Sequence, residues 1–450
     1  MKKYYLRSKA ILTSFLADER YKRILFTGSS SLILRFITIG ISLITVPLTL
    51  KYLGDERYGL WMSLSSVLAL MAFADFGLGN SLLNAISKAN GRSNIKEAQV
   101  AVSSTFFLLL GISLSLLTIL YFTYPHLNMG SILKLSTATA EREANMTFIV
   151  IFGAVLINMP LGIIQRIYEG YQEGFTYQLF LLIGTIAGFF LLVFFIHLKA
   201  GLPLLVLSYS MGNVIASILG AIHLFNYKRK ALLPRLRWFD LKEGKLAIKT
   251  GGIFLLLQLF SFLNLSSDNI IIAHTVGTSS IPQFEIAKKL FSISLMLVYF
   301  IAPLWPAFTE AMEKKDFAWA QKTLFNMLKY TFLIGAVATL PLVLFGKYII
   351  TLWVGPDYIP SYFLLIGFYL FTIVANFGGV MASFFNSGAF LKKQLLLVSI
   401  ATTTTVVCKI LFIQYFGVDW LIWANVICFT TFFILPSLQL TRRFFATRAA

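Results

Sequence analysis

Runs of apolar residues, separated by short polar segments, follow one another along almost the whole chain of 450 residues. An α-helix needs about 20 mainly apolar residues to cross a bilayer. By that criterion the sequence predicts twelve membrane-spanning helices, over residues 24–50, 58–86, 99–123, 147–170, 177–197, 201–226, 250–276, 281–310, 323–345, 360–386, 395–416 and 419–440. The pattern is that of an all-α polytopic membrane protein.

The segments between these runs are too short to fold alone. The two longest hold about two dozen residues each, fewer than the ~40 below which a chain rarely folds without help. Two pairs of glycines share a spacing of 223 positions, which favours a duplication into two six-helix repeats. The predicted parts are an N-terminal segment, a first lobe, a basic linker, a second lobe and a tail, at 1–23, 24–226, 227–249, 250–440 and 441–450.

Composition and charge support a membrane protein and set its orientation. The chain is 58% hydrophobic and 13% charged, against about 25% charged residues in a soluble domain. Of its 38 Lys and Arg residues, 27 fall on one side of the predicted membrane, 6 on the other and 5 inside spans. The positive-inside rule then places both termini in the cytoplasm. The net charge of +19 therefore reflects topology, and nucleic acid is not an expected partner. The basic linker could also bind anionic lipid headgroups, but the topological interpretation is favoured.

Residues typical of metal sites and enzymes are sparse. The chain has 2 Cys and 4 His residues, without the spacing of a metal site or a disulfide framework. No phosphate-binding loop, kinase pattern or hydrolase elbow is present. We therefore expect no cofactor, no metal and no enzymatic activity.

Three bases lie deep in predicted spans: Arg35, Lys288 and Lys409. A charge at the centre of a bilayer costs at least about 2.5–3.5 kcal/mol, so it usually faces a cavity or a partner. None of the three has an acid nearby in sequence that would fully neutralise it; a pair between Glu285 and Lys289 would leave Lys288 on another helix face. We predict that they face one central cavity and bind an anionic substrate. Lys409 could instead extend to the outer interface.

Two acids also interrupt spans. Asp75 is followed by Gly77, Gly79 and Asn80, which predict a broken helix, and such a break at membrane depth lines protein or a wet cavity. Asp268 lies in a polar stretch of the seventh span. Both acids are candidates for a cavity or for ion coupling. The alternatives are a packed kink at Asp75 and a hydrogen-bonding node between helices at Asp268.

Several motifs together resemble bacterial O-antigen flippases of the Wzx type, which belong to the multidrug/oligosaccharidyl-lipid/polysaccharide exporter superfamily. The resemblance runs in colinear order along nearly the whole chain. It is carried by YLGDERYGLW at 52–61, DFGLGN at 75–80, ISKANG at 86–91, DNIIIAH at 268–274, LWPAFTE at 304–310, LWVG at 352–355, ASFFN at 382–386 and WLIWAN at 420–425.

The resemblance implies twelve helices in two six-helix lobes around a central cavity, in the bacterial inner membrane. It implies that oligosaccharide on undecaprenyl pyrophosphate is moved from the cytoplasmic to the periplasmic leaflet by alternating access, for lipopolysaccharide assembly. An H⁺ or Na⁺ counter-ion and other polysaccharide assembly proteins are candidate partners. Buried Arg and Lys suit a pyrophosphate. A multidrug exporter of the same superfamily is the alternative, although cationic drugs need carboxylates. A membrane glycan polymerase or ligase is less favoured, because the external loops are short.

Overall fold

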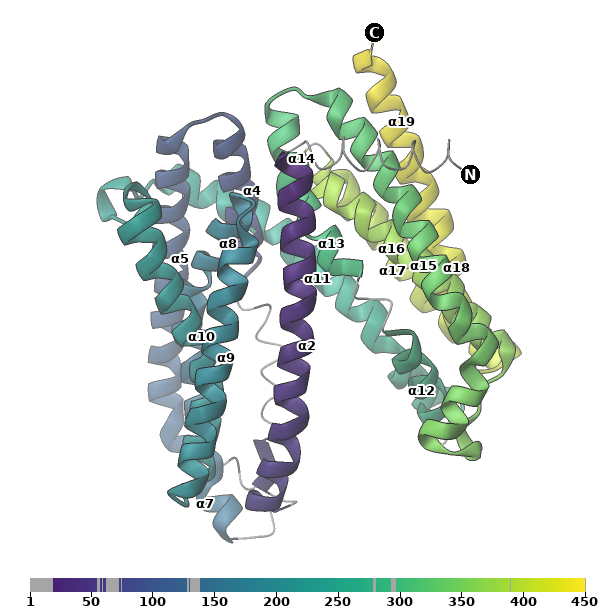
Figure 1. Cartoon of the computed structure of the whole chain (residues 1–450), viewed down its shortest axis with the longest axis horizontal. Helices are drawn as coiled ribbons and strands as arrows, with labels where there is room; N and C mark the ends of the chain where they lie inside the picture. The colour runs from purple at the N-terminus through teal and green to yellow at the C-terminus, as the bar shows by residue number, and fades with distance from the viewer. Residues whose placement is uncertain are drawn as a thin grey trace, which may run out of the picture. The chain divides into compact units, whose positions relative to one another are not determined.

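The computed structural model describes residues 19–54, 57–58, 60–61, 73, 75–127, 129, 138–277, 281–292, 297–388 and 390–449. The described chain is helical, without β-strands (Figure 1). Ten helical stretches in it are long and apolar enough to cross a membrane, at Arg20–Ile41, Ile95–His126, Thr139–Gly170, Gly174–His197, Leu202–Lys228, Leu241–Asn264, Phe317–Val354, Tyr362–Asn386, Leu391–Phe416 and Trp420–Arg448. The predicted all-α membrane fold is thus confirmed. The second and eighth predicted spans include residues outside the described ranges, so the count of twelve stays a prediction.

The chain divides into two compact units, Met1–Phe254 and Leu255–Ala450. The boundary falls inside one long helix, α11 (Leu241–Thr275). This helix begins within the segment that the sequence assigned to a linker. Three lysines in its first turns hide the start of the helix in a hydropathy pattern, because charge lowers hydropathy without opposing helix formation.

The described part of the first unit is a bundle of helices. They are α2 (Glu19–Leu53), α4 (Leu78–Gly91), α5 (Ile95–Thr123), η2 (Tyr124–His126), α7 (Ala138–Leu161), α8 (Ile163–Gly170), α9 (Gly174–His197), α10 (Leu202–Ile222), η3 (His223–Lys228), η4 (Lys230–Leu232) and η5 (Leu236–Trp238). Asn94 caps α5 by accepting the amides of Lys96 and Glu97. Helices α9 and α10 lie side by side. A Cβ on Gly188 would lie 3.0 Å from the Ser208 carbonyl oxygen, so small residues permit this approach.

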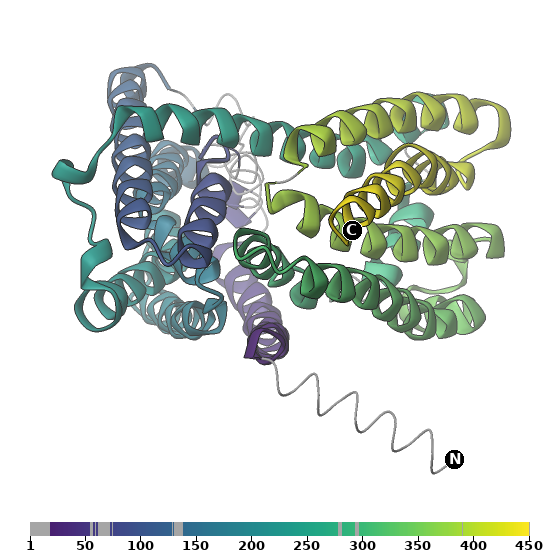
Figure 2. The same cartoon turned by 90° about the horizontal axis from the view of Figure 1, so that it is seen from above.

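In its described residues the second unit contains the rest of α11 and eight further helices: α12 (Ile281–Phe291), α13 (Val298–Ile301), α14 (Leu304–Glu313), α15 (Phe317–Val354), α16 (Tyr362–Asn386), α17 (Leu391–Phe416), α18 (Trp420–Phe429) and α19 (Leu435–Ala449), with turns η8 (Pro356–Tyr358) and η9 (Thr430–Ile434). Helix α15 lies beside α16, and α17 beside α18 (Figure 2). The predicted span 281–310 is divided: a turn at Ala302 and Pro303 separates α13 from α14. Proline lacks the N–H that would continue the helix.

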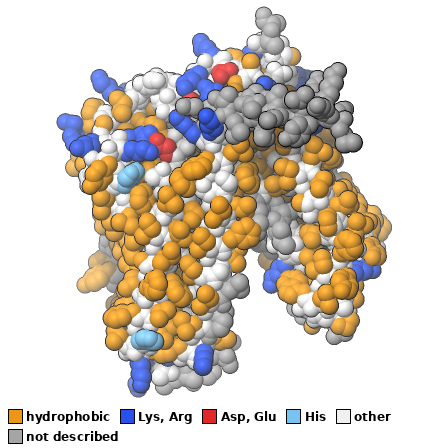
Figure 3. Space-filling model, viewed as in Figure 1, with side chains coloured by type: hydrophobic (Ala, Val, Ile, Leu, Met, Phe, Trp, Pro, Cys, Tyr) orange, Lys and Arg blue, Asp and Glu red, His pale blue; other side chains and the backbone are white. Residues whose placement is uncertain are grey.

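The outer faces of the helices are apolar. In the span Gly174–His197, only 17% of the most apolar window is buried inside the protein. Figure 3 shows the flank of the first unit covered mainly by hydrophobic side chains, with many Lys and Arg side chains at its upper end and a few at its lower end. Such surfaces are suited to lipid, with charged groups left at the water boundary.

Candidate functional site

The chain turns sharply at residues 75–77 and then begins helix α4. Phe76 and Gly77 have left-handed backbone angles, φ 50° and φ 71°. The Oδ1 atom of Asp75 accepts the Gly77 amide at 2.9 Å, and its Oδ2 atom accepts the Gly79 amide at 3.2 Å. Asp75 therefore satisfies amides that the start of a helix leaves unpaired. Its side chain is half-buried, and Asn80 lies within the first turn of α4.

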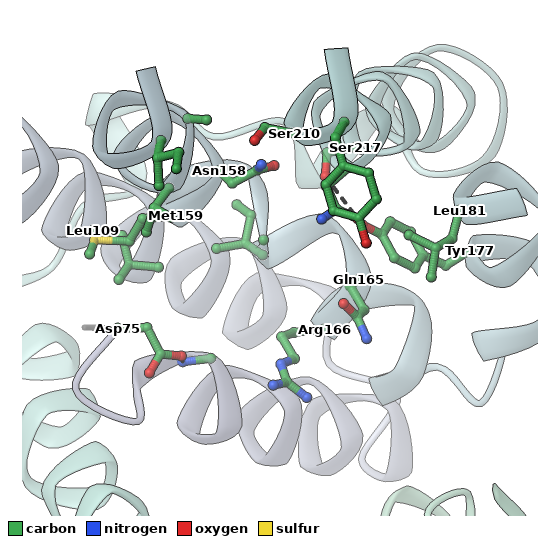
Figure 4. A pocket seen from close by; sticks show the side chains of 18 of the residues that line it. Asp75, Leu109, Asn158, Met159, Gln165, Arg166, Tyr177, Leu181, Ser210 and Ser217 are labelled. Carbon is green, nitrogen blue, oxygen red and sulfur yellow. Dashed lines mark hydrogen bonds between the residues drawn. The ribbon is translucent and has the colours of Figure 1, made fainter. Parts of the chain in front are cut away.

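At Gly79, two charged side chains from different parts of the chain come close to the same backbone position. A Cβ at Gly79 would lie 2.8 Å from Asp75 Oδ2 and 3.2 Å from the Nε atom of Arg166 on α8. A carboxylate and a guanidinium thus flank one backbone position (Figure 4). The absence of a side chain at residue 79 lets both approach the helix.

These residues line a cavity of about 590 Å³ inside the first unit. This is within the range of small-molecule sites, roughly 300–1,000 Å³. Its wall combines aromatic rings with amides, hydroxyls and two opposite charges, from Trp61, Asp75, Asn158, Gln165, Arg166, Tyr177, Tyr209, Ser210, Asn213 and Ser217. Tyr177 and Ser217 form a hydrogen bond with each other in this wall, at 3.2 Å (Figure 4). The Trp61 and Tyr209 rings meet edge to face, 5.8 Å apart.

Of the two charged residues in this wall, only Asp75 was predicted from the sequence, and Arg166 was not. Arg166 lies near the end of the predicted span 147–170, and the structure places it in α8, with its guanidinium 3.0 Å from Glu169. The adjacent pair of Gln165 and Arg166 within an otherwise apolar run was the available signal.

The second unit brings three of the sequence-selected residues together. The ammonium of Lys409 lies 2.7 Å from Asp268 Oδ1, and that of Lys288 lies 3.2 Å from Asp268 Oδ2. Asp268 is 4% exposed and Lys409 is fully buried, whereas 31% of the Lys288 side chain remains exposed. Glu285 contacts Lys288 at 3.3 Å, rather than Lys289 as its spacing suggested. One buried carboxylate therefore lies between two bases from different helices.

Arg35 lies in the first unit, on α2, with an exposed side chain. It is not among the residues that line the cavity of that unit. The structure thus groups Lys288 and Lys409 around Asp268, and groups Asp75 with Gly79.

A further cluster of charged side chains lies where the start of α9 meets the end of η3. Glu173 accepts two hydrogen bonds from Arg229, at 2.8 and 3.0 Å, and lies 3.0 Å from Lys228. Burial raises the pKa of Glu173, but Arg229 and Lys228 outweigh burial and hold that pKa below its ordinary value. Arg229 also stacks 3.8 Å above the Tyr171 ring. Burial raises the pKa of the Tyr171 hydroxyl despite this neighbouring cation.

Comparisons with known proteins agree in the class of protein that they indicate. Residues 26–312 match the profile of a family described as polysaccharide biosynthesis protein. The chain is 25% identical over 365 residues to a "Putative O-antigen export protein" of Yersinia pseudotuberculosis, covering 78% of this chain and 80% of that protein. It is 24% identical over 329 residues to a "Putative O-antigen transporter" of Salmonella typhi, covering 70% of this chain and 72% of that protein.

The fold also resembles that of a solved transporter. The structure titled as the outward-facing conformation of a multidrug resistance MATE family transporter of the MOP superfamily aligns with a TM-score of 0.78. The alignment covers 96% of this chain and 98% of the other, at 17% identity. This likeness shows a shared fold.

Proposed function

Because the chain belongs to the polysaccharide biosynthesis protein family, we propose that it is a flippase for oligosaccharide carried on undecaprenyl pyrophosphate. It moves this lipid-linked substrate from the cytoplasmic to the periplasmic leaflet of the bacterial inner membrane. Relatives named as O-antigen exporters and the transporter fold support this assignment. Transport proceeds by alternating access, with no covalent chemistry by the protein. Both termini lie in the cytoplasm, where the charge bias of the loops favours them.

The cavity of the first unit is the observation that carries the proposal. Sugars present hydroxyls around an apolar ring face, so they suit a wall of aromatic rings and amides. Trp61 and Tyr209 supply rings, while Asn158, Gln165 and Asn213 supply amides. We assign this cavity to the sugar part of the substrate. The undecaprenyl chain stays in the bilayer, against the apolar flanks of the helices.

Arg35 and Lys288 are proposed to bind the pyrophosphate. Both side chains reach the surface of their unit, and both bases form charge-assisted hydrogen bonds with phosphate oxygens. Lys409 is enclosed, so it acts on the site through Asp268, which also contacts Lys288. Asp75 is the proposed ion-coupling residue, because its carboxylate opens into the sugar cavity and could carry a proton or bind a cation.

Export assays in cells that lack the chromosomal gene test this function. Glycan of the host should accumulate on the cytoplasmic side without the protein and reach the surface with it. Asp75→Asn keeps the size of the side chain but cannot ionise, and its NH2 group cannot accept one of the two backbone N–H groups that Asp75 binds. It should impair export at normal protein levels. Arg35→Ala and Lys288→Ala should also reduce export, with Lys288→Arg less affected. Normal export by all of these variants would reject the assigned site.

A small-cation drug exporter is the alternative within this fold. It needs carboxylates in excess of bases, whereas the described wall of the cavity carries one of each, Asp75 and Arg166. A drug-resistance phenotype without any glycan defect would favour the alternative.

A further inference from the structure

The ammonium of Lys409 is surrounded by oxygen atoms from a single turn of α11. It donates to the backbone carbonyl of Asn264 at 2.7 Å and to Ser267 Oγ at 3.3 Å, and it lies 2.7 Å from Asp268 Oδ1. The side-chain amide oxygen of Asn264 lies 3.5 Å from the same ammonium. Residues 264, 267 and 268 share one face of the helix, because neighbours three and four positions apart lie one above another.

This set of oxygens has the chemistry of a site for a monovalent cation. It combines one carboxylate with a carbonyl, a hydroxyl and an amide oxygen. Carbonyl oxygens in membrane proteins replace the hydration shell of alkali cations in this way. A backbone carbonyl has two lone pairs, so Asn264 can bind a cation while it accepts the helical amide bond. The three protons of an ammonium match three of these acceptors.

We propose that this turn of α11 is a monovalent-cation site whose resident cation is the side chain of Lys409. The ammonium arrives from α17, 145 positions away in sequence, and is fully buried, so solvent ions cannot exchange with it. The other carboxylate oxygen of Asp268 faces Lys288, so each oxygen of this carboxylate lies beside a base. A soluble alkali ion is thus excluded from Asp268 as long as Lys409 is present.

One consequence concerns ion coupling. If Lys409 fills this site permanently, any coupling to a soluble cation must use another carboxylate. The inference itself does not depend on the proposed transport function, because cation binding can be measured on purified protein without substrate.

The test removes the ammonium of Lys409 and supplies soluble cations in its place. Full-length wild type and Lys409→Ala are purified in detergent. Their melting temperatures are then measured in NaCl, KCl and LiCl, against N-methyl-D-glucamine chloride at equal ionic strength. Wild type should melt at the same temperature in all four salts. Lys409→Ala should melt lower in N-methyl-D-glucamine and recover by several degrees, saturably, in at least one alkali salt, because a ligand of the native state stabilises it.

Two control variants identify the site. Lys409→Ala combined with Asp268→Asn should lose the alkali response, because the charged ligand is gone. Lys288→Ala should not gain one, because Lys409 still fills the site. Methylammonium chloride is included as a separate ligand.

Three results would overturn the proposal. These are a Lys409→Ala protein without any alkali response, the same response in the double variant, and a response to methylammonium alone, which would indicate an ammonium-specific pocket. If Lys409→Ala is too unstable to purify, its monodisperse yield from membranes solubilised in each salt replaces the melting curve. An alkali-dependent yield then supports the site, and no monodisperse protein in any salt rejects it.

Discussion

Asp268→Asn should destabilise the second unit more than replacement of either lysine that contacts this residue. The substitution keeps the size of the side chain and removes its charge. Lys409 would then remain as a fully buried ammonium without a counter-charge, since Asp268 is the acid that it contacts among the described residues. Lys288 would be affected less, because Glu285 stays 3.3 Å away and part of the side chain reaches the surface.

The size of the effect follows from burial. Removing one member of a buried ion pair costs roughly 3–5 kcal/mol. We expect about 3 kcal/mol, the lower end of that range, because Lys409 keeps Asn264 O and Ser267 Oγ as acceptors. At roughly 2–4 °C per kcal/mol for a unit of this size, the melting temperature should fall by ~6–12 °C. Lys288→Met should cost about 1 kcal/mol or less, as partly exposed pairs do.

Thermal unfolding of the purified protein, followed by tryptophan fluorescence, measures these differences. The decisive variant combines Asp268→Asn with Lys409→Met. This double variant leaves no buried charge unpaired, so it should recover most of the melting temperature that Asp268→Asn alone loses. The difference between the double variant and the sum of the two single variants measures the interaction between Asp268 and Lys409. The reasoning is refuted if Asp268→Asn melts within about 2 °C of wild type, which corresponds to under ~1 kcal/mol. A double variant no more stable than Asp268→Asn would refute it equally.

Three further predictions concern other parts of the chain. Gly79→Ala should lower both stability and glycan export, because its Cβ would lie 2.8 Å from a carboxylate oxygen. Gly252→Ala is the control, since its Cβ would have no heavy atom within 4 Å, and equal behaviour of the two variants would contradict the close packing. Glu173→Gln should lower stability at neutral pH by roughly 1.5–3 kcal/mol through its lost charged hydrogen bonds to Arg229. The pKa of Glu173 in the folded protein is depressed, so this stabilisation is fully present above the ordinary pKa of 4.5 and is lost as the pH falls through the folded-state pKa. The difference in melting temperature between wild type and Glu173→Gln should therefore shrink in acid and not at neutral pH. Reporter fusions after Ala450 and within the basic linker should both report the cytoplasm, and an external signal at either would overturn the topology.

The spans were predictable because the bilayer imposes a length and a composition on each helix. The runs at 395–416 and 419–440 were separated correctly, although two residues divide them, since helices α17 and α18 end and begin at that gap. The division of the run 281–310 at Pro303 escaped hydropathy, because a proline hardly changes the mean of an apolar segment. The proline itself indicated the division, because it cannot continue a helix.

The partners of the buried charges were not predictable from one sequence. Contacts inside a helix follow from spacing, and even there Glu285 could contact residue 288 or 289. Contacts between helices depend on how distant segments pack. The acid that contacts Lys409 is Asp268, which lies on α11 and far from α17 in sequence, so no acid near Lys409 in the chain indicated the pair. For Lys288 and Lys409 the structure shows a partner within the protein, Asp268, whereas the side chain of Arg35 is exposed.

Internal pairing changes what Lys288 can do for the proposed substrate. An unpaired base in an apolar site would hold a pyrophosphate tightly, because both charges would be desolvated and neither would have an alternative partner. Lys288 instead already contacts Asp268 and Glu285, so an incoming phosphate must compete with these two carboxylates. Departure of the substrate restores the original contacts. A carrier must bind its substrate strongly enough to select it and weakly enough to release it on the other side. A lysine shared between the protein's own acids and the proposed anion would meet both requirements, with Lys409 holding Asp268 in place throughout.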